Sequence, residues 1–294
     1  MKIKTNYHSH NTFCDGKSTM EDMVLGAIDK HFTHFGISSH APYPLDNDFA
    51  LKEENFFAYR TEFERLKDKY KNKINLFLGL EMDFVPHLIE NIRQNAETKY
   101  HLDFFIGSVH QVVNTMSEIR SPMSNADTWF IDGSKQEKYD NGLNLLFDGD
   151  IRKGVICFYT QQIEMIKKNR PDVLGHADKI VMHNKDRYFK ENEPWYMDAV
   201  VGLWDTVIKY DTIVEVNTRG IYRKRHNDFY PSSTWLKYLV EKHIPLTIAT
   251  DCHKSEETDC CYGEALEYLK FIGCKDLYYF DGSWKAEKTE NYIV

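Results

Sequence analysis

Short apolar segments alternate with amphipathic helical segments along most of this 294-residue chain, and this alternation constrains the fold more than any other feature. In the segment 53–70, for example, Phe56, Tyr59 and Phe63 recur at steps of three and four, which is the spacing of one helix face. Strands that alternate with helices lie parallel in one sheet, because each helix returns the chain to the same edge of the sheet. About seven such units, without a linker, an internal repeat or a low-complexity tract, predict one α/β domain over residues 1–294 with its sheet closed into a barrel.

The bounds of the predicted elements follow from this periodicity and from the turn residues between the segments. Strands are expected at residues 2–7, 35–39, 74–80, 102–109, 171–175, 212–216 and 245–250, with a last short strand at 277–280. Helices are expected at residues 19–31, 53–70, 87–98, 153–169, 195–210, 233–243 and 262–272. Ser18 and Glu21 have the spacing of a capping box and are expected to begin the first helix.

Residues 111–152 interrupt the alternation. They are rich in Ser, Asn, Asp and Gly, with Trp129 and Tyr139 among them. A long segment with little regular structure is often functional, so these residues are predicted to form an active-site cover with some short helix. Trp129, and Tyr43 in an earlier loop, are candidates to line the pocket beneath it.

Residues of the kind that bind metals follow six of the seven predicted barrel strands. His8 and His10 follow the first strand and stand two residues apart, so they point to the same side. The complete strand-end set is His8, His10, His40, Glu81, His110, His176, Asp251 and His253. In barrels the carboxyl ends of the strands build the functional site, so we expect these side chains to lie together.

With Asp15, in the loop after the first strand, nine candidate ligands are available. A single catalytic Zn²⁺ needs only three protein ligands and a water molecule, so the set predicts two to three divalent ions that share carboxylates. Nitrogen and oxygen ligands without thiolate suit Zn, Mn or Fe. Asp15 also has a plainer interpretation, since Asp before Gly16 is a common turn pair. Cys252 lies between two candidate ligands and is expected to point to the opposite side and pack there.

Charge and composition exclude some partners. The net charge is −8 at pH 7, from 37 basic and 45 acidic residues, which argues against a broad nucleic-acid-binding surface. No apolar run approaches the roughly 18 residues of a membrane span, so no membrane partner is expected. The six cysteines form no C-x-x-C pair and no apolar stretch follows the first four residues, so we expect a cytoplasmic protein. The oligomeric state stays open.

The strand-end residues lie in motifs that resemble those of the polymerase and histidinol phosphatase (PHP) superfamily. The motifs are His8-Ser-His10, Ser39-His40-Ala-Pro42, Gly79-Leu-Glu81-Met-Asp83-Phe84, Gly107-Ser-Val-His110, Gly175-His176-Ala-Asp178 and Thr250-Asp251-Cys-His253. The stretch 216–220, followed by an Arg-rich segment and Tyr230-Pro231, is similar to the histidinol-phosphatases of this superfamily. The resemblance covers almost the whole chain and implies a distorted (β/α)7 barrel that holds three metal ions.

The resemblance also divides the ligands among the ions. One ion would take His8, His10, Glu81 and Asp251; a second would take Glu81, as a bridge, with His110 and His176; a third would take Asp15, His40 and His253. Some family members have His at the place of Asp15.

Closely spaced metal ions suit hydrolysis of a phosphate monoester, because they lower the pKa of bound water and neutralise the phosphate oxygens. The sequence contains no G-x-S-x-G or P-loop motif that would indicate a different kind of active site. The leaving alkoxide needs a proton, for which Asp251, His253 and Asp178 are candidates beside a metal-bound water. Arg219, Arg223 and Arg225 follow the sixth strand and are candidates to bind the phosphate, although a solvated basic loop is the alternative. This Arg-rich stretch is one residue longer than the family pattern.

The resemblance implies hydrolysis of L-histidinol phosphate in histidine biosynthesis. The amino group of that substrate needs a carboxylate, for which Asp83, Asp178 and the acidic residues of 111–152 are candidates. One alternative is a PHP phosphoesterase for a nucleotide, a nucleic-acid 3′ end or a phosphotyrosyl protein. An amidohydrolase also opens with His-x-His, but that class commonly has a bridging Lys where this chain has Glu81. A further alternative is a metal-binding module without turnover, which missing ligands would favour.

Overall fold

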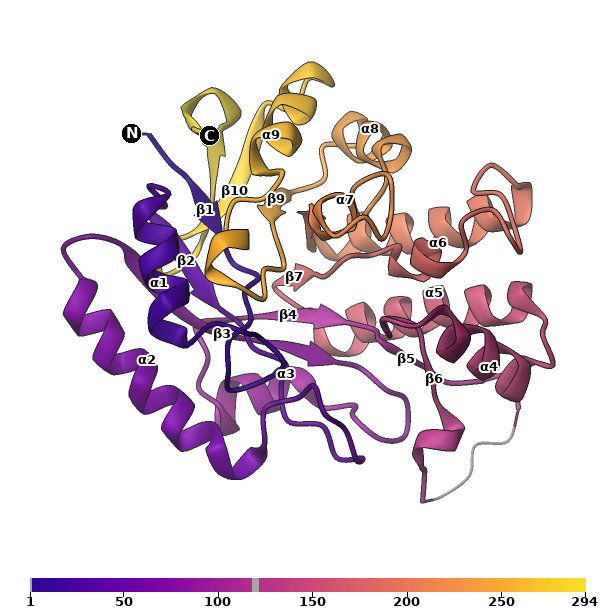
Figure 1. The fold of residues 1–294 in the computed structure, drawn as a ribbon. Helices are drawn as coiled ribbons and strands as arrows, with labels where there is room; N and C mark the ends of the chain where they lie inside the picture. Colours follow the sequence, from indigo (N-terminus) through magenta and orange to yellow (C-terminus); the bar gives the residue numbers. More distant parts are fainter. Residues whose placement is uncertain (1, 118–121) are drawn as a thin grey trace.

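The centre of the computed structural model, which describes residues 2–117 and 122–294, is a seven-stranded parallel sheet (Figure 1). The strands lie in the order β1-β2-β3-β4-β7-β8-β9. They are β1 Thr5–Asn6, β2 His34–Ile37, β3 Asn75–Asp83, β4 Phe104–Ser108, β7 Val173–Leu174, β8 Ile213–Asn217 and β9 Leu246–Ala249. All seven predicted barrel strands are present, some shorter than expected, and the predicted parallel sheet is confirmed.

The first and last strands of this order meet and nearly close the sheet into a barrel. Ser9 and Cys252 form an isolated parallel bridge beyond the ends of β1 and β9. The backbone N–H of His10 donates to the carbonyl of Cys252 at 2.8 Å, and the N–H of Cys252 donates to the carbonyl of His8 at 3.4 Å. The side chain of Cys252 is fully buried, as the sequence predicted.

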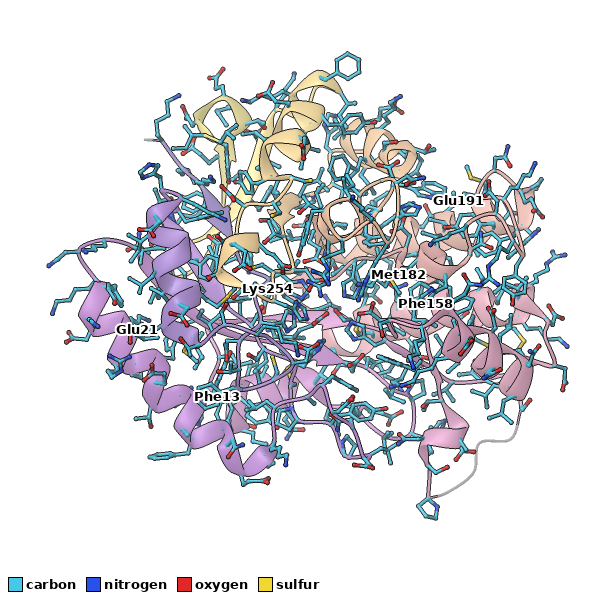
Figure 2. The ribbon with its side chains drawn as sticks, in the orientation of Figure 1. Phe13, Glu21, Phe158, Met182, Glu191 and Lys254 are labelled. Atoms are coloured by element: carbon cyan, nitrogen blue, oxygen red, sulfur yellow. The ribbon has the colours of Figure 1, made fainter. Side chains whose placement is uncertain are left out.

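Helices that alternate with the barrel strands lie outside the sheet (Figure 1). They are α1 Met20–Asp29, α2 Phe56–Tyr70, α5 Ile151–Asn169, α6 Pro194–Tyr210, α8 Ser233–Glu241 and α9 Tyr262–Phe271. Their apolar faces form the main core with the strands, and Phe158 and Met182, labelled in Figure 2, belong to it. Within the described ranges, no helix has the length and apolarity to cross a membrane.

The first helix begins one residue later than its sequence predicted. Thr19, not Ser18, is the N-cap, and it forms a capping box with Asp22. Glu21 instead accepts hydrogen bonds from Arg65 and Lys69 of α2 at 2.7 and 2.5 Å. In Figure 2 Glu21 lies on the outside, between α1 and α2. The Glu21 carboxylate therefore joins α1 to α2 and does not cap α1.

The helix predicted at 87–98 is present only from residue 92 onward. Val85 and Ile89 form an antiparallel bridge, and His87 between them has a φ of 65°. A tight turn therefore occupies the first part of the range. Only the short α3 Ile92–Gln94 and the π-helical turn η2 Asn95–Lys99 follow.

The insertion at 111–152, of which 118–121 lie outside the described residues, has more regular structure than expected. It contains β5 Gln111–Val112 paired with β6 Trp129–Phe130, the 3₁₀ turn η3 Asn125–Asp127 and α4 Gln136–Phe147. Trp129 and Tyr139 are fully buried against each other, with the indole Nε1–H donating to the carbonyl of Tyr139 at 2.8 Å. Both rings belong to the main core. Trp129 was predicted to line the pocket, and this prediction is wrong, because the ring is buried in the core.

The amino-terminal end of the barrel is filled by aromatic rings. A hairpin of β10 Asp276–Phe280 and β11 Trp284–Lys288 supplies two of them, Phe280 and Trp284, which pack on Tyr7 and Phe104. Tyr7 Oη donates to the carbonyl of Phe280 at 3.0 Å and accepts from its N–H at 2.8 Å. Glycine at position 79 leaves room for the Phe104 ring, because a Cβ there would lie 2.5 Å from that ring. This packed end leaves the opposite end of the barrel to the polar residues.

Candidate metal centre

The nine candidate ligands meet at the carboxyl ends of the strands, around the carboxylate of Glu81. Its Oε2 lies 3.2 Å from His8 Nε2, 3.4 Å from His10 Nε2 and 3.1 Å from His40 Nδ1. Its Oε1 lies 3.0 Å from His176 Nε2 and 3.4 Å from His110 Nε2. One buried carboxylate therefore faces five imidazoles, and each of its oxygens serves a different group of them.

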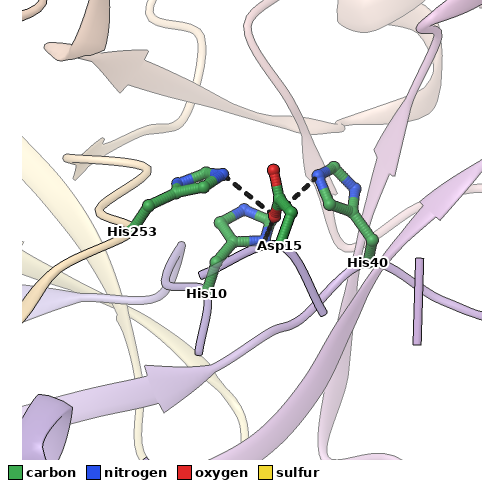
Figure 3. Close-up of side chains that lie close together, drawn as sticks. All are labelled: His10, Asp15, His40 and His253. Atoms are coloured by element: carbon green, nitrogen blue, oxygen red, sulfur yellow. Dashed lines mark ion pairs between the residues drawn. The ribbon is translucent and has the colours of Figure 1, made fainter. Parts of the chain in front are cut away.

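The other members of the set complete two sides of this cluster. Asp251 Oδ1 lies 3.4 Å from His10 Nε2 and 3.9 Å from His8 Nε2. Asp15 Oδ1 lies 3.2 Å from His253 Nε2 and 3.8 Å from His40 Nε2 (Figure 3). The loop residue Asp15 thus joins the strand-end residues, and its side chain does more than form the turn before Gly16.

Several buried polar atoms of the cluster have no hydrogen-bond partner. They are His8 Nε2, His10 Nε2, His40 Nδ1 and Asp15 Oδ1. Leaving such atoms unpaired in the interior is costly, so buried polar groups nearly always have a partner. These atoms belong to imidazoles and a carboxylate whose free atoms face one another, and that donor set fits divalent cations.

Ligand atoms within 4.8 Å of one another divide into overlapping groups. One group is His10, Asp15, His40 and His253, and another is Glu81, His110 and His176. His8 belongs to two groups, one with His10 and Glu81 and one with His176 and Asp251. These groups contain the second and third ligand sets implied by the resemblance, and they place His10 nearer to the third set than expected.

Buried carboxylates behind the cluster orient two of its histidines. Glu215 of β8 lies 2.8 Å from His8 Nδ1 and accepts the backbone N–H of His176 at 2.7 Å. Asp83 lies 3.0 Å from His110 Nδ1 and accepts the N–H of His110 at 2.9 Å. With Nδ1 held in this way, Nε2 of each ring faces the cluster, as in the carboxylate–histidine pairs of metal sites. Sequence analysis missed Glu215 and gave Asp83 a different role, although Asp83 shares a strand face with Glu81.

The buried carboxylates and histidines of the cluster shift one another's pKa values. Burial alone would raise the pKa of Glu81, but His8, His110 and His40 hold that pKa well below its usual range. Likewise burial opposes the charge of Asp251, but Arg219 and His8 keep its pKa low. Burial, with His253 and His40 nearby, lowers the pKa of His10 well below its usual value. Burial would lower the pKa of His8 and of His110, but Glu215 and Glu81 raise it at His8, and Asp83 and Glu81 raise it to about 10 at His110. The carboxylates are therefore ionised, as a cation site requires, and a bound cation would displace the protons of these two rings.

A pocket of about 450 Å³ opens onto the cluster and is lined by Asp15, His40, His110 and His253. All three predicted arginines line it as well. Arg219 is almost fully buried and donates to the carbonyl of Asp251 at 2.5 Å. Arg223 donates to Glu257 at 3.0 Å, and Arg225 lies 3.5 Å from Asp132.

Sequence analysis missed Lys179, and it included Asp132 only among the acidic residues of 111–152 that are candidates to bind an amine. Asp132, in the insertion, lines the pocket, and its Oδ1 lies 3.2 Å from the ammonium of the buried Lys179. Lys179 also lies 3.8 Å from Asp251 Oδ2. No local pattern marks either residue, because the pair forms only when the insertion folds over the barrel end.

Of the three candidates for proton transfer, His253 alone lines the pocket, and Asp178 lies away from it. Asp178 is fully buried, and its Oδ2 accepts the N–H of Ser232 at 2.8 Å. Burial, with Glu191 nearby, raises its pKa to about 8. His253 lines the pocket and Asp251 lies beside it in the cluster, whereas Asp178 is directed into the protein.

Comparison with known proteins places the chain in a family. The PHP domain model matches residues 6–219. The chain belongs to the PHP domain family. This PHP domain protein is 27% identical to the "Probable histidinol-phosphatase" of Schizosaccharomyces pombe, over 94% of this chain and 89% of that protein.

Two solved structures share the PHP barrel. The hisK protein of Listeria monocytogenes superposes with a TM-score of 0.77 at 19% identity, over 89% of this chain and 99% of that one. Histidinol phosphate phosphatase from Lactococcus lactis, crystallised with Zn, L-histidinol and phosphate, has a TM-score of 0.65 at 20% identity, over 97% of this chain and 99% of that one. The fold and family predicted from the sequence motifs are therefore confirmed.

Proposed function

We propose that this PHP domain protein is a metal-dependent phosphomonoesterase that hydrolyses L-histidinol phosphate to L-histidinol and phosphate. The observation that carries the proposal is the cluster around Glu81, with its unpaired buried nitrogens, at the base of an arginine-lined pocket. The histidinol-phosphatases among its relatives support the substrate.

The nine clustered residues are proposed as ligands for two to three divalent ions, with Zn, Mn and Fe as the candidates. Bound divalent ions supply Lewis acidity, activation of water at neutral pH and neutralisation of phosphate charge. Glu81 is suited to a bridging position, because its two oxygens face different groups of histidines. Glu215 and Asp83 keep the rings of His8 and His110 in their orientation.

The arginines are proposed to hold the phosphate. Arg219 is fixed by Asp251 and Tyr222, and its guanidinium faces the pocket from a buried position. The side chains of Arg223 and Arg225 are 40% and 25% exposed, whereas that of Arg219 is 8% exposed, so Arg219 is the most confined of the three. A planar, immobile guanidinium matches two phosphate oxygens with little loss of entropy.

The proton for the leaving alcohol would come from water held at the centre, because His253, the one candidate that lines the pocket, is also proposed as a metal ligand. The Nδ1 of His253 lies 3.1 Å from the carbonyl of Asp251, which leaves Nε2 on the pocket side near Asp15. Asp251 is engaged by Lys179, Arg219 and two histidines. Asp178 is not proposed for this step, because it does not line the pocket.

The enclosed dimensions of the site favour a small substrate. The pocket of about 450 Å³ is closed on one side by Phe130 and Asp132 of the insertion. A nucleic-acid enzyme would need an open basic channel for its polymer. We therefore propose a small-molecule monoester as the substrate, in a cytoplasmic biosynthetic setting.

A panel of phosphate monoesters tests the function directly. Protein of known metal content is assayed with histidinol phosphate, p-nitrophenyl phosphate and mononucleotides. We expect kcat/KM for histidinol phosphate to be at least about tenfold higher, or roughly 1.4 kcal/mol of discrimination. Equal efficiency across the panel, or preference for nucleotides, would reassign the substrate and leave the metal centre in place.

A further inference from the structure

The pocket wall is dominated by positive charge. Its cationic residues are Lys17, Lys138, Arg219, Arg223, Arg225 and Lys254. Such a wall suits the phosphate end of a substrate, but it repels an ammonium group at the other end. A substrate with both groups therefore needs a carboxylate that is not already neutralised by the protein.

Four carboxylates line the pocket, and three of them have partners. Asp15 lies within 4 Å of three histidines, Asp132 pairs with Lys179 and Arg225, and Glu257 accepts from Arg223 and from the N–H of His253. Asp48 is exposed to solvent and is the one lining carboxylate, among the described residues, without a hydrogen bond or ion pair. Of the acidic groups expected from sequence to bind the amine, Asp83 and Asp178 are engaged inside the protein, and Asp132 of the insertion is already paired with Lys179.

An aromatic wall stands next to Asp48. Phe49 and Phe130 are stacked, with centroids 5.8 Å apart and planes 10° apart, and both line the pocket. The Phe49 ring also meets the edge of the His40 ring at 5.3 Å, so this wall adjoins the metal cluster. The N–H of Leu51 donates to the carbonyl of His40 at 3.1 Å and ties the loop to that position.

We propose that the loop after β2 selects the substrate: Asp48 pairs with an ammonium group, and the Phe49–Phe130 wall holds a planar ring. The inference rests on the proposed phosphomonoesterase function and narrows its substrates to monoesters with a cation and a ring. Residues 48 and 49 thus recognise the part of the substrate that does not react, namely its ammonium group and its ring. The phosphate remains with the cluster and the arginines.

Paired substrates and a matched variant test this assignment. Wild-type protein, Asp48→Asn, Asp48→Glu and Asp46→Asn are assayed with histidinol phosphate and with the analogue that lacks only the amino group. Asp46 lies on the same loop but lines a different groove, so Asp46→Asn is the control. The readout is the ratio of kcat/KM for the two esters, together with the inhibition constant of histidinol, which carries no phosphate.

Asp48→Asn should lower this ratio about fivefold, the size expected for a partly exposed ion pair, and should weaken histidinol inhibition by a similar factor. Asp48→Glu should restore part of the ratio, and Asp46→Asn should keep the wild-type value. An unchanged ratio in Asp48→Asn, or the same loss in Asp46→Asn, would overturn the assignment. If wild-type protein hydrolysed neither ester, the proposed function itself would fail, and this inference with it.

The ring contact has its own variant. Phe49→Leu keeps an apolar side chain but removes the ring, and it should reduce kcat/KM for histidinol phosphate more than that for an aliphatic amino-alcohol phosphate. Equal losses for the two esters would assign Phe49 to packing against His40 and not to ring recognition.

Discussion

The two ends of the barrel are formed by the same strands, but one end is apolar and the other is charged and polar. Along β3, Phe77 and Glu81 lie on one face, and along β4 the same holds for Ile106 and Ser108. At the amino-terminal end these faces carry rings that pack together. At the carboxyl end they carry charged and polar groups, and Ser108 donates to Glu81 at 2.6 Å.

Polar groups at the two ends differ in whether the protein itself satisfies them. The hydroxyl of Tyr7 at the packed end has both its donor and acceptor roles filled by Phe280. At the cluster, His8 Nε2 and His10 Nε2 are buried without a partner. At the first end the polypeptide itself supplies the hydrogen-bond partners, whereas at the second end the free polar atoms are positioned for a ligand. Substitutions at the two ends should therefore affect different properties.

The largest effect is expected for Glu81→Gln at the cluster. The amide keeps the size of the side chain but loses the charge that faces five histidines. Turnover should fall more than about 10³-fold, or 4 kcal/mol, with loss of bound metal. Metal analysis and kcat on the same sample measure both. Glu53→Gln, an exposed carboxylate paired with Lys99, is the control. Near-normal turnover at normal metal content would rule out the bridging position.

At the packed end, Phe104→Ala should destabilise the fold by about 3–5 kcal/mol, because it removes a buried ring from the middle of an aromatic cluster. The metal content and KM of the folded fraction should stay unchanged. Urea unfolding and metal analysis make the comparison. A loss of metal at low temperature, without loss of stability, would mean that the two ends are not independent.

Removing one supporting carboxylate should have an intermediate effect. Glu215→Gln or Asp83→Asn should weaken metal binding about 10- to 100-fold, since each carboxylate fixes the ring of one candidate ligand. Competition with a chelator of known affinity gives the change. If both variants retain the wild-type affinity, the orientation of His8 and His110 does not depend on these carboxylates.

The smallest effect is expected for Tyr7→Phe. The ring remains in place and only the hydrogen bonds to Phe280 are lost, at a cost of about 1 kcal/mol. Thermal unfolding should show a small decrease in Tm at full metal content. A loss as large as that of Phe104→Ala would show that the hydroxyl, and not the ring, holds the hairpin to the barrel.

The barrel and the clustering of its nine candidate ligands were predictable, because both follow from patterns between residues close together in the sequence. Period 2 and period 3.6 mark strands and helices, and residues such as His40 and His176 directly follow their strands. The distribution of His10 was less predictable: its ring lies 4.4 Å from His40 and 4.1 Å from His253 between centroids, beside the residues predicted for the third ion. Sequence order alone does not show how far a side chain at one strand end leans toward the next.

Other parts depended on partners distant in the chain. Ser18 and Thr19 are equally good caps, and the choice of Thr19 frees Glu21 to bond to α2. The burial of Trp129 requires Tyr139 to fold back over it, and nothing in the composition of the insertion distinguishes a cover from a segment packed into the core. Sequence analysis did not distinguish Asp48 from other loop residues. Asp48 stands out only because the other carboxylates that line the pocket are paired.

The seam between β1 and β9 has a consequence for biosynthesis of the chain. His8 and His10 are made almost at once, but Asp251 and His253, which lie across the Ser9–Cys252 bridge, come some 240 residues later. A chain still on the ribosome therefore carries histidines that have no complete site until β9 emerges and joins β1. The proposed metal ions, if they bind only the closed barrel, would stabilise that state by mass action, and their binding would then report that β9 has joined β1.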